Sequence, residues 1–277
     1  MEFPFQQMPT VPSLLVVTPT LGHSPYLPGM MKDVARIARS VVLQQVVVAP
    51  EATVGALRRQ WPSASIAAEP PECGMYGAIN AAADAAGDWE WLTWINDDDL
   101  LLPGFQEVWR RAQAEPTVAD VWYGEVDYLD ADGRKVAAMP VCRRPTDVPA
   151  LLAAGLAPFT QQGALISRDL WRKIGGMDAS LRIAGDFDFW VRAAAIGAHF
   201  KFVCRTVAAF RVHGGQLSGN ARHAKDEEAK VLRRHNLQVS RVGQQLAALR
   251  FRAQNLPRIL HRVWRTGHLS SRGMFAR

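Results

Sequence analysis

The stretch WEWLTWINDDD, residues 89–99, decides the fold and marks a candidate site. Its apolar part predicts a buried strand over 91–95, which ends at three consecutive carboxylates, Asp97, Asp98 and Asp99. Like charges this close raise the free energy of ionising all three. A divalent cation would relieve the repulsion, since hard cations prefer oxygen ligands. The alternative is a solvated acidic turn before a helix that begins at Pro103.

Strands and helices alternate around this stretch. Apolar runs predict strands over 14–17, 46–48, 65–68 and 91–95, and helical spacing predicts helices over 27–41, 54–60, 77–86 and 103–114. This alternation predicts a doubly wound, mainly parallel α/β sheet. In such sheets ligands bind beyond the carboxyl ends of the strands, so Thr18-Pro19-Thr20 and the three aspartates are expected to share one crevice.

The second half of the chain is less regular. A strand over 121–128 and a hairpin partner over 135–137 flank the turn 130–133, and further strands are predicted over 163–167, 200–203 and 207–210. Helices are predicted over 146–154, 168–174 and 186–196. Asp186 stands at the start of the last of these, where helix capping is one interpretation of its role.

Composition limits the class of protein. The chain has 277 residues with 48% hydrophobic and 21% charged side chains, which is typical of a globular protein with ample core. Its three cysteines are widely spaced and form no CxxC pair, which argues against a disulfide framework and a zinc site. No secretory leader or bilayer-spanning apolar run is evident, so we expect a cytoplasmic protein.

The basic charge is concentrated in the tail. The net charge is +6, yet no acidic residue follows Glu228, whereas eleven Lys and Arg do, so residues 1–229 carry −5 (6 − 11). Apolar residues recur at helical spacing over 256–264, and the opposite face holds Arg258, His261, Arg262 and Arg265. One interpretation places this helix on an anionic membrane surface at the inner face of the membrane. In the other, it packs on its own domain with a solvated basic face. No nucleic acid is expected, because no binding motif accompanies the charge.

Four motifs occur in a fixed order over about residues 13–220. They are VVTPT (16–20), ECGMYGAIN (72–80), WINDDD (94–99) and a series made of QGALI (162–166), IGGMD (174–178), AGDFD (184–188) and RVHGGQLS (211–218). Together they resemble family 2 glycosyltransferases of the GT-A fold, particularly the bacterial branch that builds surface polysaccharides. Each motif is weak alone, and the ordered set is specific.

The resemblance implies transfer of a sugar, with inversion, from a nucleotide-diphosphate sugar to a hydroxyl of a glycan, lipid-linked or other acceptor. It implies a Mn²⁺ or Mg²⁺ ion that stabilises the charge of the leaving diphosphate. It also implies a glycosyltransferase domain over 1–220, with a nucleotide-sugar half (13–115) and an acceptor and catalytic half (116–220). A basic helical tail follows over 221–277.

The resemblance allows two alignments of the aspartates. Asp99 belongs to both and is the expected metal ligand, Asp98 is a second ligand or a ribose partner, and Asp97 is the least certain donor contact. His213 is expected to complete the metal or diphosphate site, and its alternative is a loop histidine bonded to backbone. Asp186 occupies the position of the family's catalytic base.

Further donor contacts are implied at the positions Thr18, Pro19, Thr20, Glu72, Tyr76 and Asn80. Two departures put the identity of the donor in doubt. The second strand lacks the family's acidic residue, for which Glu51 is the sole replacement, and Ala81 stands where the family has a lysine after Asn80.

Two other functions compete with this interpretation. A nucleotidyltransferase would need a glycine-rich, basic phosphate loop after the first strand, which LGHSP (21–25) does not provide. A degenerate, non-catalytic protein that binds a nucleotide sugar fits the missing second-strand acid. The presence of both the aspartate triplet and Asp186 argues against it.

Overall fold

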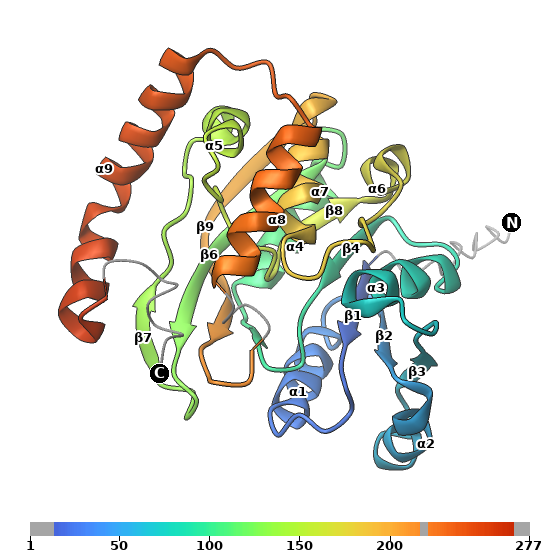
Figure 1. Cartoon of the computed structure of the whole chain (residues 1–277). Coiled ribbons are helices and arrows are strands. Elements are labelled where there is room, and N and C mark those ends of the chain that lie inside the picture. The colour runs from blue at the N-terminus through green and yellow to red at the C-terminus, as the bar shows by residue number, and fades with distance from the viewer. Residues whose placement is uncertain (1–13, 217–220, 269–277) are drawn as a thin grey trace, which may run out of the picture.

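The computed structural model describes residues 14–216 and 221–268, in which nine strands form one sheet (Figure 1). The strands are β1 (Leu14–Pro19), β2 (Leu43–Ala49), β3 (Ser65–Ala68), β4 (Trp91–Trp94), β5 (Leu100–Leu101), β6 (Val121–Leu129), β7 (Lys135–Ala138), β8 (Leu165–Ser167) and β9 (Phe200–Arg211). Their order is β3-β2-β1-β4-β8-β6-β9-β5, with β7 paired to β6. Strands β3, β2, β1 and β4 are parallel, β8 is antiparallel to both its neighbours, and β6 runs parallel to β9.

Helices cover both faces of the sheet. They are α1 (Leu27–Ile37), α2 (Glu51–Gln60), α3 (Gly74–Ala85), α4 (Phe105–Ala114), α5 (Val148–Ala153), α6 (Arg168–Ile174), α7 (Gly185–Ala195), α8 (Ala221–Arg234) and α9 (Arg241–Thr266), with a 3₁₀ turn at Pro145–Asp147. Because side chains alternate along a strand, β1 sends Leu14 and Val16 to the core under α1, α2 and α4, and Leu15 and Val17 to the core under α3, α5, α6 and α7. The predicted doubly wound sheet is therefore confirmed.

The second half differs from the prediction in two places. The strands expected over 200–203 and 207–210 are one continuous strand, β9, whose pairing with β6 absorbs two register shifts. The two-residue strand β5 was not predicted, since it is too short for a sequence pattern, and it pairs with β9. The predicted hairpin is confirmed as β6 and β7, and Gly133 in its turn has a φ of +84°.

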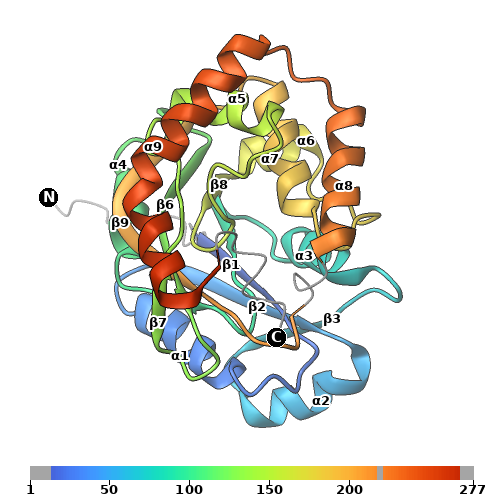
Figure 2. The same cartoon turned by 60° about the vertical axis from the view of Figure 1, so that its left-hand side comes forward.

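The two tail helices pack on the rest of the chain. Figures 1 and 2 show α8 against α7, and α9 along the outside of the molecule beside α5 and β7. The expectation of a solvated basic face over 258–265 is wrong for two members, because Arg262 is buried and Arg258 is largely covered. No helix in the described ranges combines the length and apolarity needed to cross a bilayer. Residues 217 and 218 of the RVHGGQLS motif and tail residues 269–277 lie outside the described residues.

Candidate active site

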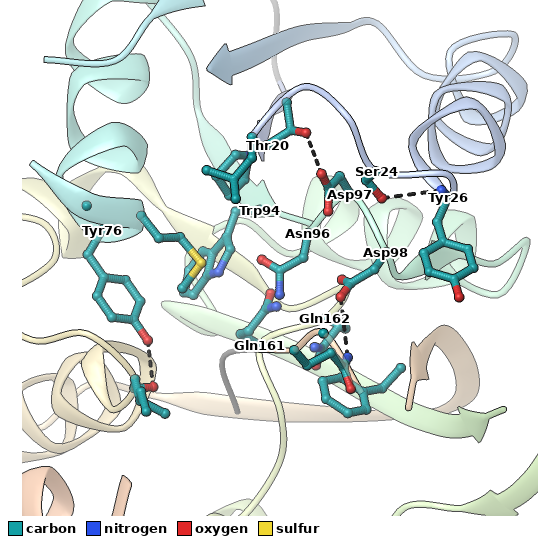
Figure 3. A pocket seen from close by; sticks show the side chains of 18 of the residues that line it. Thr20, Ser24, Tyr26, Tyr76, Trp94, Asn96, Asp97, Asp98, Gln161 and Gln162 are labelled. Atoms are coloured by element: carbon teal, nitrogen blue, oxygen red, sulfur yellow. Dashed lines mark hydrogen bonds between the residues drawn. The ribbon is translucent and has the colours of Figure 1, made fainter. Parts of the chain in front are cut away.

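A cleft of about 650 Å³ opens at the carboxyl ends of the parallel strands (Figure 3). Its walls come from the segments that follow β1, β3, β4 and β9, and from the first turns of α3 and α7. This is the edge where parallel sheets bind ligands, and the volume suits a small molecule. The cleft contains Pro19, Thr20, Tyr76, Asp97, Asp98, Asp186 and His213, which the sequence singled out.

The three adjacent aspartates point in different directions. A turn closed by Asp99 N–H donating to the Asn96 carbonyl follows β4. Asp97 accepts a hydrogen bond from the Thr20 hydroxyl, and Figure 3 shows the Asp98 side chain turned away from it. Burial raises the pKa of Asp97, although the Thr20 bond opposes the shift. The turn thereby separates like charges that the sequence places side by side.

Asp99 lies behind the wall of the cleft. Its side chain is fully buried, and it accepts hydrogen bonds from Gln162 Nε2 (2.9 Å) and from the backbone N–H of Arg211 (3.0 Å). Burial, with a smaller contribution from the charge of Asp98, raises its pKa well above the ordinary value. The sequence ranked Asp99 first as metal ligand, whereas the structure uses one of its oxygens to bond β9 and the other to bond the segment before β8.

Asp98 faces the cleft together with His213. His213 Nε2 lies 3.0 Å from Asp98 Oδ2, and Gly215 N–H donates to His213 Nδ1, so we assign the neutral ring's proton to Nε2. The other carboxylate oxygen, Asp98 Oδ1, is buried and has no hydrogen-bond partner among the described residues. The same holds for Asn96 Oδ1. Unpartnered oxygens in a cleft fit a hard divalent cation.

The protein offers few ligands for such a cation. Within residues 14–216 and 221–268, no three His, Cys, Asp or Glu side chains converge to hold a metal. Asp98 Oδ1 would therefore supply a partial site, with His213 holding the other oxygen of that carboxylate, and phosphate oxygens and water must complete it. Magnesium is commonly held in this way, by one or two carboxylates plus substrate phosphates.

Arg211 fixes this side of the cleft from beneath. Its Nε donates to the Asp98 carbonyl (3.0 Å), its Nη1 donates to the Ala131 carbonyl (3.2 Å), and its guanidinium lies 4.4 Å from the ring centre of Tyr26. One buried cation thus joins the aspartate turn, the β6–β7 hairpin and the segment before α1. Sequence reasoning assigned this arginine no role beyond its place in the RVHGGQLS motif.

Asp186 stands in the first turn of α7 and lines the cleft. The helix cap is Ala184, without a side-chain capping bond, so the capping interpretation is not supported. Asp186 Oδ1 accepts a hydrogen bond from the adjacent Phe187 N–H (2.8 Å). Burial raises the pKa of Asp186 to about 6, against that hydrogen bond, and the nearby charge of Glu228 adds to the shift. Such a carboxylate suits general-base chemistry near neutral pH.

Tyr76 packs directly against the residue before Asp186. Its hydroxyl donates to the Ile183 carbonyl (2.7 Å), and a Cβ added to Gly185 would lie 2.5 Å from its ring. Burial, followed by the charge of Asp186, raises the pKa of Tyr76 well above 10, so the hydroxyl stays protonated. The ring therefore occupies the space that a side chain at position 185 would need, which explains the glycine in this motif.

Glu227 of α8 holds the segment that leads to Asp186. Its carboxylate accepts the backbone N–H groups of Arg182 (3.0 Å), Ile183 (2.9 Å) and Ala184 (2.9 Å). Burial opposes ionisation, but these three donors lower the pKa of Glu227 below its usual 4.5. No local pattern could reveal this role, because the partners lie more than forty residues apart along the chain.

Four predicted donor contacts lie outside the cleft. Thr18 is fully buried with its hydroxyl beside the Met30 sulfur (3.6 Å), and Asn80 exchanges two hydrogen bonds with the Met177 backbone (2.8 and 2.9 Å). Glu51 and Glu72 are exposed, on α2 and on the turn before α3. A different carboxylate, Glu69 directly after β3, lines the cleft instead.

Known proteins were compared with this geometry. No protein-family model and no curated protein sequence matches the chain. Solved structures do match. The UDP complex of S. aureus TarS 1–349 has a TM-score of 0.59 at 13% identity, over 88% of this chain and 72% of that one. The chain has a GT-A-like fold.

Two further matches extend this likeness. The mannosyltransferase PcManGT from Pyrobaculum calidifontis, in complex with GDP-Man and Mn²⁺, has a TM-score of 0.53 at 17% identity, over 89% of this chain and 76% of that one. Glucosyl-3-phosphoglycerate synthase from Mycobacterium tuberculosis, in complex with Mn²⁺, UDP and phosphoglyceric acid, has a TM-score of 0.54 at 17% identity, over 82% of this chain and 80% of that one. The chain spans 43% of a longer S. aureus TarS structure. The structural likeness establishes the GT-A-like fold. The sequence identities are too low to resolve family 2 or its bacterial branch.

The contact between Tyr76 and Gly185 predicts an unusual cost for a small substitution. Gly185→Ala should destabilise the protein by about 1–3 kcal/mol, because the added methyl meets the buried ring. Chemical denaturation measures the change. Gly29→Ala is the matched control: this helical glycine has no atom within 4 Å of the added Cβ, so alanine there should be neutral or stabilising. Equal stability of the two variants would contradict the packing described.

Proposed function

We propose that this chain is an inverting, divalent-cation-dependent glycosyltransferase that moves a sugar from a nucleotide-diphosphate sugar to an acceptor hydroxyl. One observation carries the proposal: a single cleft at the carboxyl edge of a GT-A-like sheet contains the Asp98–His213 pair and the carboxylate of Asp186. The structures of similar fold that contain UDP or GDP-Man, two of them with Mn²⁺, support a nucleotide-sugar donor.

The donor diphosphate is assigned to the β4 and β9 edge of the cleft. Asp98 Oδ1 is the proposed holder of Mn²⁺ or Mg²⁺, His213 is proposed to orient that carboxylate through Nε2–H, and Asp99 is reassigned from ligand to support of the turn. When bound, the cation neutralises charge that develops on the leaving nucleoside diphosphate. Asp97, held by Thr20, faces the same space and is proposed to contact the donor.

The nucleoside is assigned to the segments after β1 and β3. Pro19, Thr20 and Glu69 line this part of the cleft. We propose that Glu69 makes the donor contact that was expected of Glu51 or Glu72, because Glu69 lines the cleft on this side of the sheet and the other two do not.

Asp186 is the proposed general base. Its ionised carboxylate takes the proton of the acceptor hydroxyl while that oxygen bonds to the anomeric carbon and the bond from this carbon to the diphosphate oxygen breaks. Tyr76 and Glu227 do not touch the reacting atoms in this scheme, and they position Asp186 through Gly185 and through residues 182–184. Since Glu227 belongs to α8, we propose that the catalytic unit extends beyond residue 220.

The two competing functions remain distinguishable. The cleft includes His23 and Ser24 from the segment after β1 and shows no glycine-rich phosphate loop there, so a nucleotidyltransferase has less support. A protein that only binds a nucleotide sugar would use the same cleft without turnover. Measuring binding and transfer separately decides between them.

Metal-linked donor binding should depend on Asp98 and not on Asp99. Titration calorimetry of UDP and GDP with Mn²⁺ should show that Asp98→Asn weakens binding by about tenfold or more, as loss of a metal contact requires. Asp99→Asn should keep the metal dependence and instead lower stability by about 1–3 kcal/mol, because a buried hydrogen-bond network is altered. The reverse pattern would restore Asp99 as the ligand, and no metal-dependent binding in the parent chain would remove the proposal.

Replacing the base should separate binding from chemistry. Asp186→Asn should preserve donor affinity and reduce transfer, across a panel of nucleotide sugars and acceptors, by about 10²–10⁴-fold. Equal loss of donor affinity and of transfer would remove Asp186 from the role of base. Donor binding without transfer in the parent chain, over a full panel, would favour the binding-only function.

The pKa of Asp186 sets the acid side of the pH profile. The base acts as a carboxylate, so kcat/KM should be constant above the pKa of about 6 and fall about tenfold per pH unit below it. Donor affinity measured over the same pH range is the control, because Asp97 also has a raised pKa. A profile that stays flat down to pH 5 would contradict the assignment.

A further inference from the structure

Helix α9 exposes its apolar side. Its large hydrophobic residues Val242, Leu246, Leu249, Leu256, Leu260 and Trp264 are all exposed, with Leu249 at 64%, Leu260 at 58% and Trp264 at 77%. Together with Ala253 they recur every three or four residues, so they form one continuous line along the 26-residue helix, which we call the apolar stripe. Figures 1 and 2 show α9 along the outer edge of the molecule.

Polar anchors hold the opposite side of α9 on the fold. Asn255 is fully buried and exchanges two hydrogen bonds with the backbone of Val141 (3.1 and 3.0 Å). Arg258 donates to the Met139 carbonyl (2.9 Å) and pairs with Glu125 (2.5 Å). Arg250 makes a bidentate pair with Asp147 (2.6 and 2.8 Å). These directional contacts act with the buried Ala247 and the half-buried Phe251 to fix the rotation of the helix, and the usual amphipathic arrangement is largely reversed, with most large apolar side chains outward.

The charge beside the apolar stripe has one sign. Helix α9 contains no acidic residue, and none follows Glu228 in the sequence. Arg241, Arg252 and Arg265 are exposed on the helix, and Arg241 and Arg252, about three turns apart, share one flank of the stripe. The surface is therefore apolar along its centre and cationic at its edge.

We propose that α9 docks the protein on an anionic membrane surface. The helix lies in the plane of the interface, with the apolar stripe, Trp264 included, at the boundary of headgroups and acyl chains and the exposed arginines on anionic headgroups. Charge complementarity selects this occupant over a second copy of the chain, since two copies would bring cationic flanks together. The proposal does not depend on the proposed sugar transfer.

The structure changes which residues carry this interaction. The sequence alone placed Arg258 and Arg262 on the exposed basic face, whereas both point toward the fold. The apolar stripe also begins at Val242, more than three turns before the segment 256–264 that the sequence indicated. The cations that can reach a membrane are Arg241, Arg252 and Arg265.

Vesicle flotation of the full chain tests the proposal without donor or acceptor. Vesicles of phosphatidylcholine alone should not bind it, and vesicles with about one third phosphatidylglycerol should, less so at high salt. The variant Leu256→Ser/Leu260→Ser/Trp264→Ser should bind those anionic vesicles at least about tenfold more weakly than the parent chain. Its unfolding midpoint should match that of the parent chain, since the three side chains are already exposed. Val42→Ser/Val118→Ser/Ile196→Ser, which replaces three exposed hydrophobic residues off the helix, should bind like the parent.

A second pair of variants tests the charge. Arg241→Gln/Arg252→Gln should weaken binding to the anionic vesicles by about tenfold, while Arg39→Gln/Arg59→Gln, which removes the same charge elsewhere, should not. Trp264 is the most exposed of the nine tryptophans, so a blue shift of fluorescence on vesicle binding should disappear in Trp264→Phe.

Three results would overturn the proposal. The full chain could fail to float with anionic vesicles, or the serine variant could float as well as the parent chain. Alternatively, light scattering could show a dimer of the parent that the serine variant dissociates, which would assign the apolar stripe to a second copy. Because every measurement omits the sugar donor, failure here leaves the proposed transferase function untouched, and failure of transfer leaves this proposal untouched.

Discussion

Three adjacent carboxylates cannot stay together in a partly dehydrated turn, and the architecture of the site follows from how they are separated. The turn after β4 turns Asp97 toward Thr20, Asp98 toward His213 and Asp99 into the core. The partners lie at the ends of β1 and β9 and on the segment before β8, so separating the charges also fixes the edge of the sheet. This arrangement leaves Asp98 Oδ1 without a hydrogen-bond partner among the described residues, at the place where a divalent cation is proposed to bind.

The Asp186 side of the cleft is built by a different means. Asp186 has few direct partners, and its position depends on backbone held from outside its own helix. Glu227 binds the preceding loop through three N–H groups, and the Tyr76 ring fills the space over Gly185. A carboxylate left with little hydrogen bonding in a buried place has a raised pKa, which is the property that a general base needs. Support and reactivity are thus assigned to separate carboxylates.

The reversed packing of α9 belongs to the same pattern of buried polar contacts. Asn255 bonds to the Val141 backbone, and Arg258 bonds to the Met139 carbonyl and to Glu125. These contacts satisfy polar groups that would otherwise be costly to bury. Because these bonds fix the rotation of the helix, its leucines and Trp264 face solvent. A helix held mainly by apolar contacts would bury them, whereas α9 is held by these polar anchors with Ala247 and Phe251, so its apolar stripe forms the surface proposed to meet the membrane.

The sequence by itself determined the doubly wound sheet, the hairpin and the crevice shared by Thr20 and Asp98, because apolar periodicity and strand ends are local signals. Tertiary structure alone decided which aspartate faces the cleft, since Asp99 is withdrawn by partners more than sixty residues away. It also decided that Glu69 and not Glu72 lines the cleft, that Glu227 holds the segment before Asp186, and which face of α9 is exposed. Each of these depends on contacts between distant segments, for which residue spacing carries no information.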